Sequence, residues 1–240
     1  SGSKSHPTNL SWQVVESLPV SETIKTGSHP RDEHIKAWIE SMENLSELGI
    51  KVICYNFMPI LDWTRTELAA PMSSGATAMY FDLLDFIAFD CFILDRMNAQ
   101  NDYEKKLVDK AKHRFEGFSK EKKLILTKNI TAGLPGASEK LTFQEVKRRL
   151  ESYSGIDAHK LRENFKYFLD AVVPTAEKMG VRLCCHPDDP PWPLLGLPRI
   201  MSTEEDYNWL VNVHPSKANG ITLCTGSLGT SFENDLPGMV

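Results

Sequence analysis

Apolar residues recur along the chain with two different spacings, which together predict an α/β fold. Between residues 29 and 48 they fall three or four positions apart, as in an amphipathic helix, and Gly49 is placed to end that helix. Short β-branched or continuously apolar runs predict buried strands. These runs cover residues 12–15, 50–55, 181–186 and 220–224. Strands that alternate with helices in this way are typical of a parallel sheet.

The second part of the chain repeats this pattern. Residues 141–153 and 157–179 have helical spacing, and Gly180 is placed to end the longer helix. Pro174 lies inside that helix and is expected to bend it. A shorter helix is predicted over residues 203–211, with Thr203 as its N-cap.

The segment 62–128 interrupts the alternation and is predicted to be a mostly helical insertion outside the sheet. A loop is expected at 71–75, an apolar helix at 81–94, and a polar helical region at 103–129. A turn is expected at 133–136. We therefore predict one partial barrel domain over residues 11–240. Residues 1–10 are expected to be a cloning remnant or an irregular N-terminus.

The number of strands leaves the closure of the sheet open. A complete (β/α)8 barrel takes roughly 250 residues, or about 30 for each unit. Without the insertion the chain has room for five or six units, and only four strands are clear. An open half-barrel would leave unpaired strand edges. We therefore expect a fragment or a chain completed by another copy, and predict a homo-oligomer.

Composition narrows the class of protein. The chain has 27 Lys and Arg against 32 Asp and Glu, so its net charge of −5 argues against nucleic-acid binding. It contains no apolar run of about 18 residues, so no membrane span is predicted. The five cysteines form no CxxC pair, and no secretory signal is visible. These features predict a cytoplasmic protein with free thiols.

The candidate chemistry follows the strands, because parallel barrels carry their active sites at the carboxyl ends of strands. His186 ends one predicted strand and Cys224 ends the next. Imidazole and thiolate both bind divalent iron, manganese or zinc, so the pair is a candidate metal site. The alternative is a loop histidine and a structural cysteine. The remaining cysteines, at positions 54, 91, 184 and 185, are expected to lie in the core.

Polar residues after the strands are candidates for substrate binding. Asp188 and Asp189 could orient His186 or bind substrate hydroxyls, or could simply form Asp-Pro turns. Arg65 suits a carboxylate, although an exposed loop arginine is the simpler interpretation. Trp63 could line a pocket or cap the core.

Seven collinear segments of the chain resemble the mannonate dehydratase family. They are Val14-Val-Glu-Ser17, Cys54-Tyr-Asn-Phe-Met-Pro-Ile-Leu-Asp-Trp-Thr-Arg-Thr66, Asn129-Ile-Thr-Ala-Gly-Leu-Pro-Gly136, Leu161-Arg-Glu-Asn-Phe165, His186-Pro-Asp-Asp-Pro-Pro191, Leu195-Gly-Leu-Pro-Arg199 and Cys224-Thr-Gly-Ser227. The resemblance implies a (β/α)8 TIM barrel of the xylose-isomerase-like type, only partly present here. It also implies a hydro-lyase that converts D-mannonate into 2-keto-3-deoxy-D-gluconate in hexuronate breakdown, with Fe²⁺ or Mn²⁺.

By this resemblance His186 and Cys224 are metal ligands. The residues expected to bind the sugar acid are Asn56, Asp62, Trp63, Arg65 and Asp188. Two further family ligands, a His and an Asp, belong to later strands that this sequence lacks, as do an Arg-Pro-Asp-His-Gly block and a Tyr with proton-transfer roles. The catalytic acid and base are therefore unknown here.

Two other functions stay open at this point. One is a related metal-dependent sugar isomerase on the same barrel. The other is an inactive barrel fragment that needs a partner chain.

Overall fold

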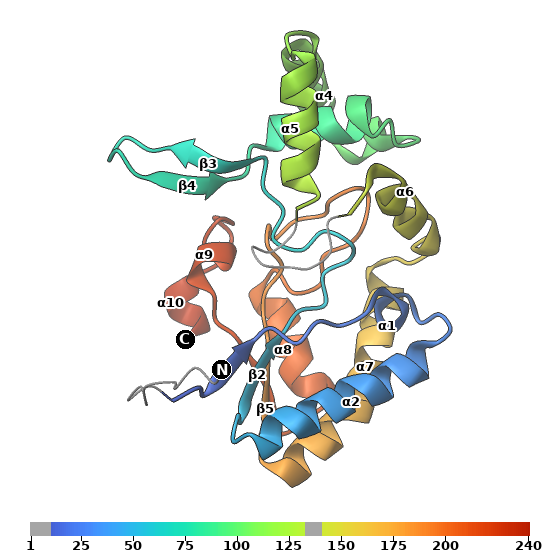
Figure 1. Cartoon of the computed structure of the whole chain (residues 1–240), viewed down its shortest axis with the longest axis vertical. Helices are drawn as coiled ribbons and strands as arrows, with labels where there is room; N and C mark the ends of the chain where they lie inside the picture. Colours follow the sequence, from blue (N-terminus) through green and yellow to red (C-terminus); the bar gives the residue numbers. More distant parts are fainter. Residues whose placement is uncertain (1–10, 133–140) are drawn as a thin grey trace, which may run out of the picture.

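A parallel four-stranded sheet forms the centre of the molecule. The computed structural model describes residues 11–132 and 141–240, so the turn predicted at 133–136 lies outside the described residues. The strands are β1 (Val14–Glu16), β2 (Val52–Tyr55), β5 (Arg182–Cys185) and β6 (Asn219–Ile221). They lie in the order β1–β2–β5–β6, and every neighbouring pair is parallel (Figure 1). The predicted parallel α/β arrangement is confirmed.

One face of this sheet is covered by three helices. They are α2 (Arg31–Glu47), α7 (Ala158–Met179) and α8 (Glu204–Val213). The Tyr55 ring on β2 lies 6.1 Å from Trp38 of α2 and 5.8 Å from Phe168 of α7, with all three side chains buried. Leu183 of β5 is fully buried in the same core. The apolar positions at helical spacing are therefore the ones that pack on the sheet.

The opposite face of the sheet carries the alternate residues of each strand. Glu16, Cys54 and Cys184 lie side by side in register across β1, β2 and β5. Because side chains in a strand alternate between faces, these three point away from the side that holds Tyr55. Val14, two residues before Glu16, is 47% exposed. Within the described residues, this face is not covered by a long helix (Figure 1).

The helix ends confirm several sequence predictions. Gly49 follows α2 with φ of +85°, and Gly180 caps α7 with φ of +64°, a backbone region that glycine enters without strain. Thr203 caps α8 and forms a reciprocal capping box with Asp206. Helix α7 continues through Pro174.

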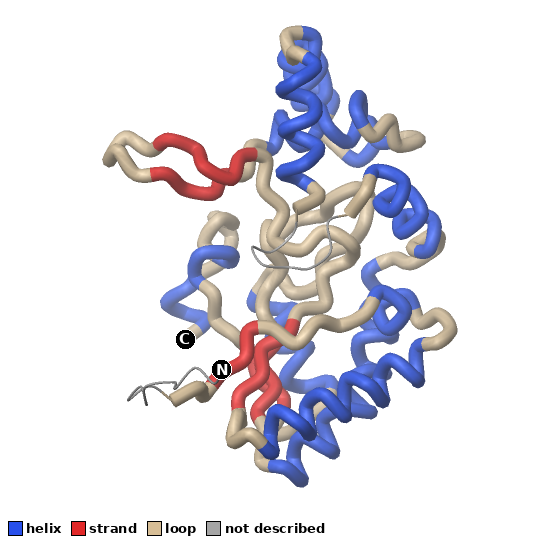
Figure 2. Tube along the Cα trace, in the orientation of Figure 1, coloured by secondary structure: helices blue, strands red, loops and turns tan. Residues whose placement is uncertain are grey.

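The segment after β2 contains an antiparallel hairpin that the sequence did not predict. Its strands are β3 (Glu67–Pro71) and β4 (Thr77–Tyr80), and the loop between them contains most of the predicted 71–75 loop. Figure 2 shows the hairpin projecting away from the body of the molecule. The sequence 68–80 is rich in Ala and Met, which have little preference for strands, so no strand was evident there.

Helices make up the rest of this segment. The apolar region is α3 (Leu83–Ala88), which passes into a π-helical turn, η1 (Phe89–Ile93). A short 3₁₀ turn, η2 (Ala99–Asp102), precedes α4 (Lys105–Glu116) and α5 (Lys120–Ile130). The predicted region 103–129 is thus two helices, and Ser119 begins the second by accepting a hydrogen bond from the Lys122 amide.

Four shorter helices complete the described chain. They are α1 (Glu22–Thr26), α6 (Phe143–Ser152), α9 (Thr225–Leu228) and α10 (Leu236–Met239). Helix α1, which was not predicted, packs against α7 because the Asn164 amide donates a 2.8 Å hydrogen bond to the Lys25 carbonyl. None of the described helices combines the length and the apolar character needed to cross a bilayer.

Candidate functional site

The candidate site lies where the chain leaves the carboxyl ends of β2, β5 and β6. Asn56 follows β2, His186 follows β5, and Cys224 comes shortly after β6. The strands are parallel and adjacent, so these three loops leave the same edge of the sheet. The topology therefore collects these residues at the carboxyl edge of the sheet, as expected from the order of the strands.

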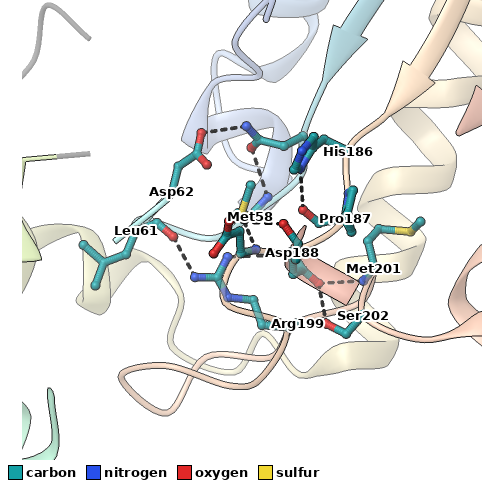
Figure 3. A network of polar contacts seen from close by, with 12 residues as sticks. Met58, Leu61, Asp62, His186, Pro187, Asp188, Arg199, Met201 and Ser202 are labelled. Atoms are coloured by element: carbon teal, nitrogen blue, oxygen red, sulfur yellow. Dashed lines mark hydrogen bonds and ion pairs between the residues drawn. The ribbon is translucent and has the colours of Figure 1, made fainter. Parts of the chain in front are cut away.

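Of the two ring nitrogens of His186, one is hydrogen-bonded within the protein and the other faces the candidate site. The side chain is buried, and its Nδ1 atom lies 2.8 Å from the Pro187 carbonyl oxygen (Figure 3). A carbonyl oxygen only accepts hydrogen bonds, so Nδ1 carries a proton, and in the neutral ring the lone pair is on Nε2. The Nε2 atom lies 3.9 Å from a carboxylate oxygen of Glu16 on β1, and the Trp63 ring is 6.0 Å from the imidazole. This tautomer leaves Nε2 able to bind a metal ion.

Cys224 is half-buried and caps the N-terminus of α9. Its Sγ atom lies 3.5 Å from the Ser227 hydroxyl, which in turn lies 3.1 Å from Oδ2 of Asp189. The thiol is thereby linked to the loop that follows β5. Cys54, Cys91 and Cys185 are buried as predicted, whereas Cys184 is only half-buried.

The donor atoms of His186 and Cys224 suit divalent iron or manganese, but two ligands hold a metal weakly. Among residues 11–132 and 141–240, no group of three or more His, Cys, Asp and Glu side chains is placed to bind a metal ion. The described part of the chain can therefore supply some of the ligands of a metal site, but not a complete set.

Asp62 has one bonded and one unbonded carboxylate oxygen. Its Oδ2 accepts a 2.6 Å hydrogen bond from the Asn56 amide, while its buried Oδ1 has no partner (Figure 3). Burial raises the pKa of the Asp62 carboxyl, although the charge of Lys25 and the Asn56 bond act in the opposite direction. A buried acceptor without a donor is costly for the fold, so Asp62 is well suited to accept a hydrogen bond from a ligand.

A cavity of about 680 Å³ lies beside Asp62. Its wall includes Glu22 and Lys25 of α1, which the sequence did not single out. The Glu22 carboxylate accepts hydrogen bonds from Lys25 at 2.8 Å and from the Tyr153 hydroxyl at 2.6 Å. Burial acts to raise the pKa of Glu22, but Lys25 and the hydrogen bonds outweigh it, so the net pKa is lowered. Nothing in the spacing of Glu22 and Tyr153, 131 residues apart, could have shown this contact.

Arg65 is already paired within the protein. Its two terminal nitrogens donate to both carboxylate oxygens of Asp189, at 2.8 and 3.0 Å. The guanidinium also lies 5.3 Å from the Trp63 ring. A substrate carboxylate at Arg65 would have to share or displace Asp189. Trp63 itself lies between Arg65 and His186, on the wall of the site.

Asp188 is completely enclosed and bonded to its own surroundings. Its Oδ2 accepts hydrogen bonds from the Met201 amide at 2.7 Å and the Ser202 hydroxyl at 3.0 Å (Figure 3). Arg199, which the sequence analysis did not propose as a site residue, lies 3.8 Å from Asp188 and donates to the Leu61 carbonyl at 2.6 Å. Burial raises the pKa of Asp188, and Arg199 opposes that shift. The two residues fasten the loops after β2 and β5 to each other.

Comparison with known proteins gives one consistent family. The family model described as D-mannonate dehydratase (UxuA) matches residues 4–240. A mannonate dehydratase of Rhizobium meliloti is 49% identical over 96% of this chain, and mannonate dehydratase 1 of Agrobacterium fabrum is 51% identical over 95%. The chain covers 57% of each of these relatives.

A solved structure agrees with the sequence comparisons. The crystal structure of mannonate dehydratase from Streptococcus suis serotype2 superimposes with a TM-score of 0.65 at 32% identity. It covers 95% of this chain, and this chain covers 51% of it. The chain therefore spans about half to three-fifths of the length of these relatives.

Proposed function

Because the chain belongs to the mannonate dehydratase family, we propose that it serves in the removal of water from D-mannonate, yielding 2-keto-3-deoxy-D-gluconate. The observation that carries this proposal is the match of about half of all residues across almost the whole chain. The family model spans every residue of the candidate site. A hydro-lyase is therefore favoured over a sugar isomerase.

The reaction defines what the site has to do. Dehydration removes a proton from the carbon beside the carboxylate and expels a hydroxyl from the next carbon, so negative charge grows at the carboxylate end. We propose Fe²⁺ or Mn²⁺ as the cofactor, which when bound would stabilise that charge. His186 through Nε2 and Cys224 through Sγ would be two of its ligands, supported by the His186 tautomer.

The chain's own residues would hold the sugar acid. Asp62, with its unpartnered Oδ1, is proposed to accept a hydrogen bond from a substrate hydroxyl, and Asn56 fixes its orientation. Trp63 would form an apolar wall beside His186. Arg65 and Asp188 are proposed to act by shaping the two loops, because both are bonded within the protein.

We also propose a fold for the whole protein and its location in the cell. Four parallel strands in chain order, with helices on one face, are what about half of a (β/α)8 barrel would contain. We propose that they belong to such a barrel, supported by the likeness to a chain about twice as long. Five free cysteines support the cytoplasm as its location.

A chimera gives the sharpest test. Residues 4–240 would replace the matched segment of the Agrobacterium fabrum relative, and loss of one water from D-mannonate would be followed by mass spectrometry with Mn²⁺ or Fe²⁺. We expect product from the chimera, and none from its His186→Ala form. A Leu124→Ala form serves as control, because this exposed α5 side chain lies outside the site. A folded chimera that leaves D-mannonate unchanged while the relative converts it would overturn the proposal.

A further inference from the structure

The turn that carries Leu61 and Asp62, shown in Figure 3, has an unusual backbone. Ile60 and Trp63 both have positive φ, at +57° and +55°, and Asp62 lies between them. A β-branched isoleucine rarely adopts this conformation, because its side chain crowds the backbone there. The Leu61 amide donates to the Pro59 carbonyl at 2.6 Å and closes the turn. Such a conformation persists only where the surrounding structure fixes it.

A buried ion pair on α1 holds this turn. Lys25 is only 5% exposed, and its ammonium group donates to the Glu22 carboxylate at 2.8 Å and to the Met58 carbonyl at 2.7 Å. The second carboxylate oxygen of Glu22 accepts a hydrogen bond from the Ile60 amide at 3.2 Å. The pair is therefore bonded to the backbone on both sides of Pro59.

The pair is itself anchored to the body of the molecule. The Tyr153 hydroxyl, at the end of α6, donates to the Glu22 carboxylate at 2.6 Å. The side-chain amide of Asn164 on α7 is buried and donates to the Lys25 carbonyl at 2.8 Å. Contacts from α6 and α7 therefore fix the position of α1, and α1 in turn holds a loop of the candidate site.

The cavity beside the turn gives it room to move. Ile60 and Asp62 line this cavity of about 680 Å³, as do Glu22 and Lys25. Within the described residues, Oδ1 of Asp62 has no hydrogen-bond partner, and Oδ2 is bonded to the Asn56 amide. One hydrogen bond between side chains does not set the backbone angles of the turn, so the bonds from α1 to the backbone are needed to hold it in place.

We propose that Glu22 and Lys25 are positioning residues, which hold the left-handed turn at Ile60 so that Asp62 faces the substrate. This inference rests on the proposed function, in which the unpartnered oxygen of Asp62 accepts a hydrogen bond from a hydroxyl of the sugar acid. Neither Glu22 nor Lys25 has to touch that substrate. Binding groups have to be held within about 0.5 Å of their productive position, which a turn with left-handed residues does not achieve by itself.

Hydrogen exchange of backbone amides tests the hold on the turn without any measurement of activity. Lys25→Met keeps the length of the side chain and removes its charge and its donors. Peptides that cover residues 58–63 are expected to exchange about tenfold faster or more in Lys25→Met, because a charged hydrogen bond to this backbone is lost. The control is Lys166→Met, the same change at an exposed position of α7.

A second variant keeps this measurement decisive. Circular dichroism and thermal melting establish that the variants are folded. Should Lys25→Met not fold, Glu22→Gln is measured on the same peptides, because it keeps the shape of the side chain and removes the charge that pairs with Lys25. Faster exchange over residues 58–63, with α2 unchanged, is the expected result for either variant.

The effect on the substrate is measured in the chimera with the Agrobacterium fabrum relative. Lys25→Met is expected to lower kcat/KM for D-mannonate on the order of tenfold, mainly through KM, since a displaced Asp62 binds the substrate less well. In a chimera that already carries Asp62→Ala, Lys25→Met is expected to have little further effect, because the group that Lys25 positions is gone. A residue that only stabilised the fold would lower kcat/KM by the same factor in both chimeras.

Two results would overturn the proposal. One is that the 58–63 peptides exchange no faster in Lys25→Met than in Lys166→Met. The other is that Lys25→Met lowers kcat/KM equally with and without the Asp62 carboxylate. A folded chimera that is inactive with Lys25 intact would overturn the proposed function and the positioning role that rests on it, and the exchange measurement would then decide separately whether the pair holds the turn.

Discussion

Arg65 and Asp189 face each other in a two-pronged ion pair that joins the loop after β2 to the loop after β5. Both nitrogen–oxygen distances are 3.0 Å or less, and the side chains are only 14% and 10% exposed. The Ser227 hydroxyl lies 3.1 Å from the same carboxylate, so the segment after β6 is attached as well. The pair thus holds together three loops that leave separate strands.

Removing one partner of this pair is expected to destabilise the protein strongly. Arg65→Ala leaves Asp189 buried without its counter-charge, which typically costs about 3–5 kcal/mol. Urea unfolding would measure the loss. The control is Lys166→Ala, because Lys166 pairs with Asp170 at the exposed surface of α7 and should contribute little. Equal unfolding midpoints for Arg65→Ala and the unaltered chain would show that the pair does not fasten the loops.

The Glu22 carboxylate is expected to stabilise the folded protein by an amount that depends on pH. Its pKa is lowered in the folded protein because Lys25 and the hydrogen bonds from Lys25, Tyr153 and Ile60 outweigh the effect of burial. A carboxyl with a lowered folded pKa stabilises the fold above its unfolded value of 4.5, and this stabilisation is lost as the pH falls through the folded pKa. Glu22→Gln should therefore be less stable than the unaltered chain at pH 7.

The difference between the two proteins should shrink as the pH is lowered below 4.5. Thermal melting between neutral and acidic pH would record it. A matched control is Glu40→Gln, whose carboxyl lies on the exposed surface of α2. A Glu22→Gln deficit that is independent of pH would argue against the ionised network and would point to lost packing alone.

Gly196 is expected to tolerate no side chain. Its φ is +70°, and a Cβ atom there would lie 2.8 Å from Nη1 of Arg96 and 2.8 Å from Oδ2 of Asp102. Arg96 also forms two hydrogen bonds with the fully buried Asp90. Gly196→Ala should thus strain the backbone and push the Asp90–Arg96–Asp102 group away from the 194–198 turn, at a cost of about 1–3 kcal/mol.

Limited proteolysis would show whether the residues around Asp102 become accessible in Gly196→Ala. Gly117→Ala provides the comparison, because Gly117 has a negative φ and its nearest atom would lie at an ordinary 3.5 Å. We expect Gly117→Ala to be as resistant as the unaltered chain. Identical cleavage of the two glycine variants would refute this role for Gly196.

Phe168 lies at the centre of the aromatic core between the sheet and the helices. Its ring is 5.1 Å from Trp38, 5.8 Å from Tyr55 and 6.1 Å from Phe57, and the side chain is fully buried. Phe168→Ala is expected to cost about 3–5 kcal/mol in free energy of unfolding, because it removes apolar burial and leaves a cavity. Urea unfolding measures the change, with the exposed Leu124→Ala as control. A loss below about 1 kcal/mol would mean that the core collapses around the gap.

The sequence predicted the elements whose signals are local. The helix now seen at α7 had a long apolar stripe, a glycine after it and a neighbouring strand, and all three reappear in the structure. The parallel strands β2 and β5 were equally clear. The hairpin was missed because alanines and methionines carry no alternating pattern, and α1 was missed because five residues are too few to show a period.

The sequence predicted where the residues of the candidate site lie, but it did not predict which side chains they contact. The end of each strand indicated where Asn56, His186 and Cys224 lie. The partners of Arg65 and Asp188 were not predictable, because Asp189 and Met201 reach them only through the tertiary fold. Glu22 and Tyr153 were missed for the same reason. Whether His186 and Cys224 bind one metal ion stays a prediction.

The helix-covered face of the sheet has a consequence for the order of events during folding. Tyr55, Leu183 and the aromatic side chains of α2 and α7 that cover this face all belong to the described chain, whereas its relatives are considerably longer. Because these packing partners lie within one stretch of chain, this layer can consolidate without contacts to the opposite face, which holds Glu16, Cys54 and Cys184. The loops at the carboxyl ends of the strands would then be arranged on a layer whose packing is already complete.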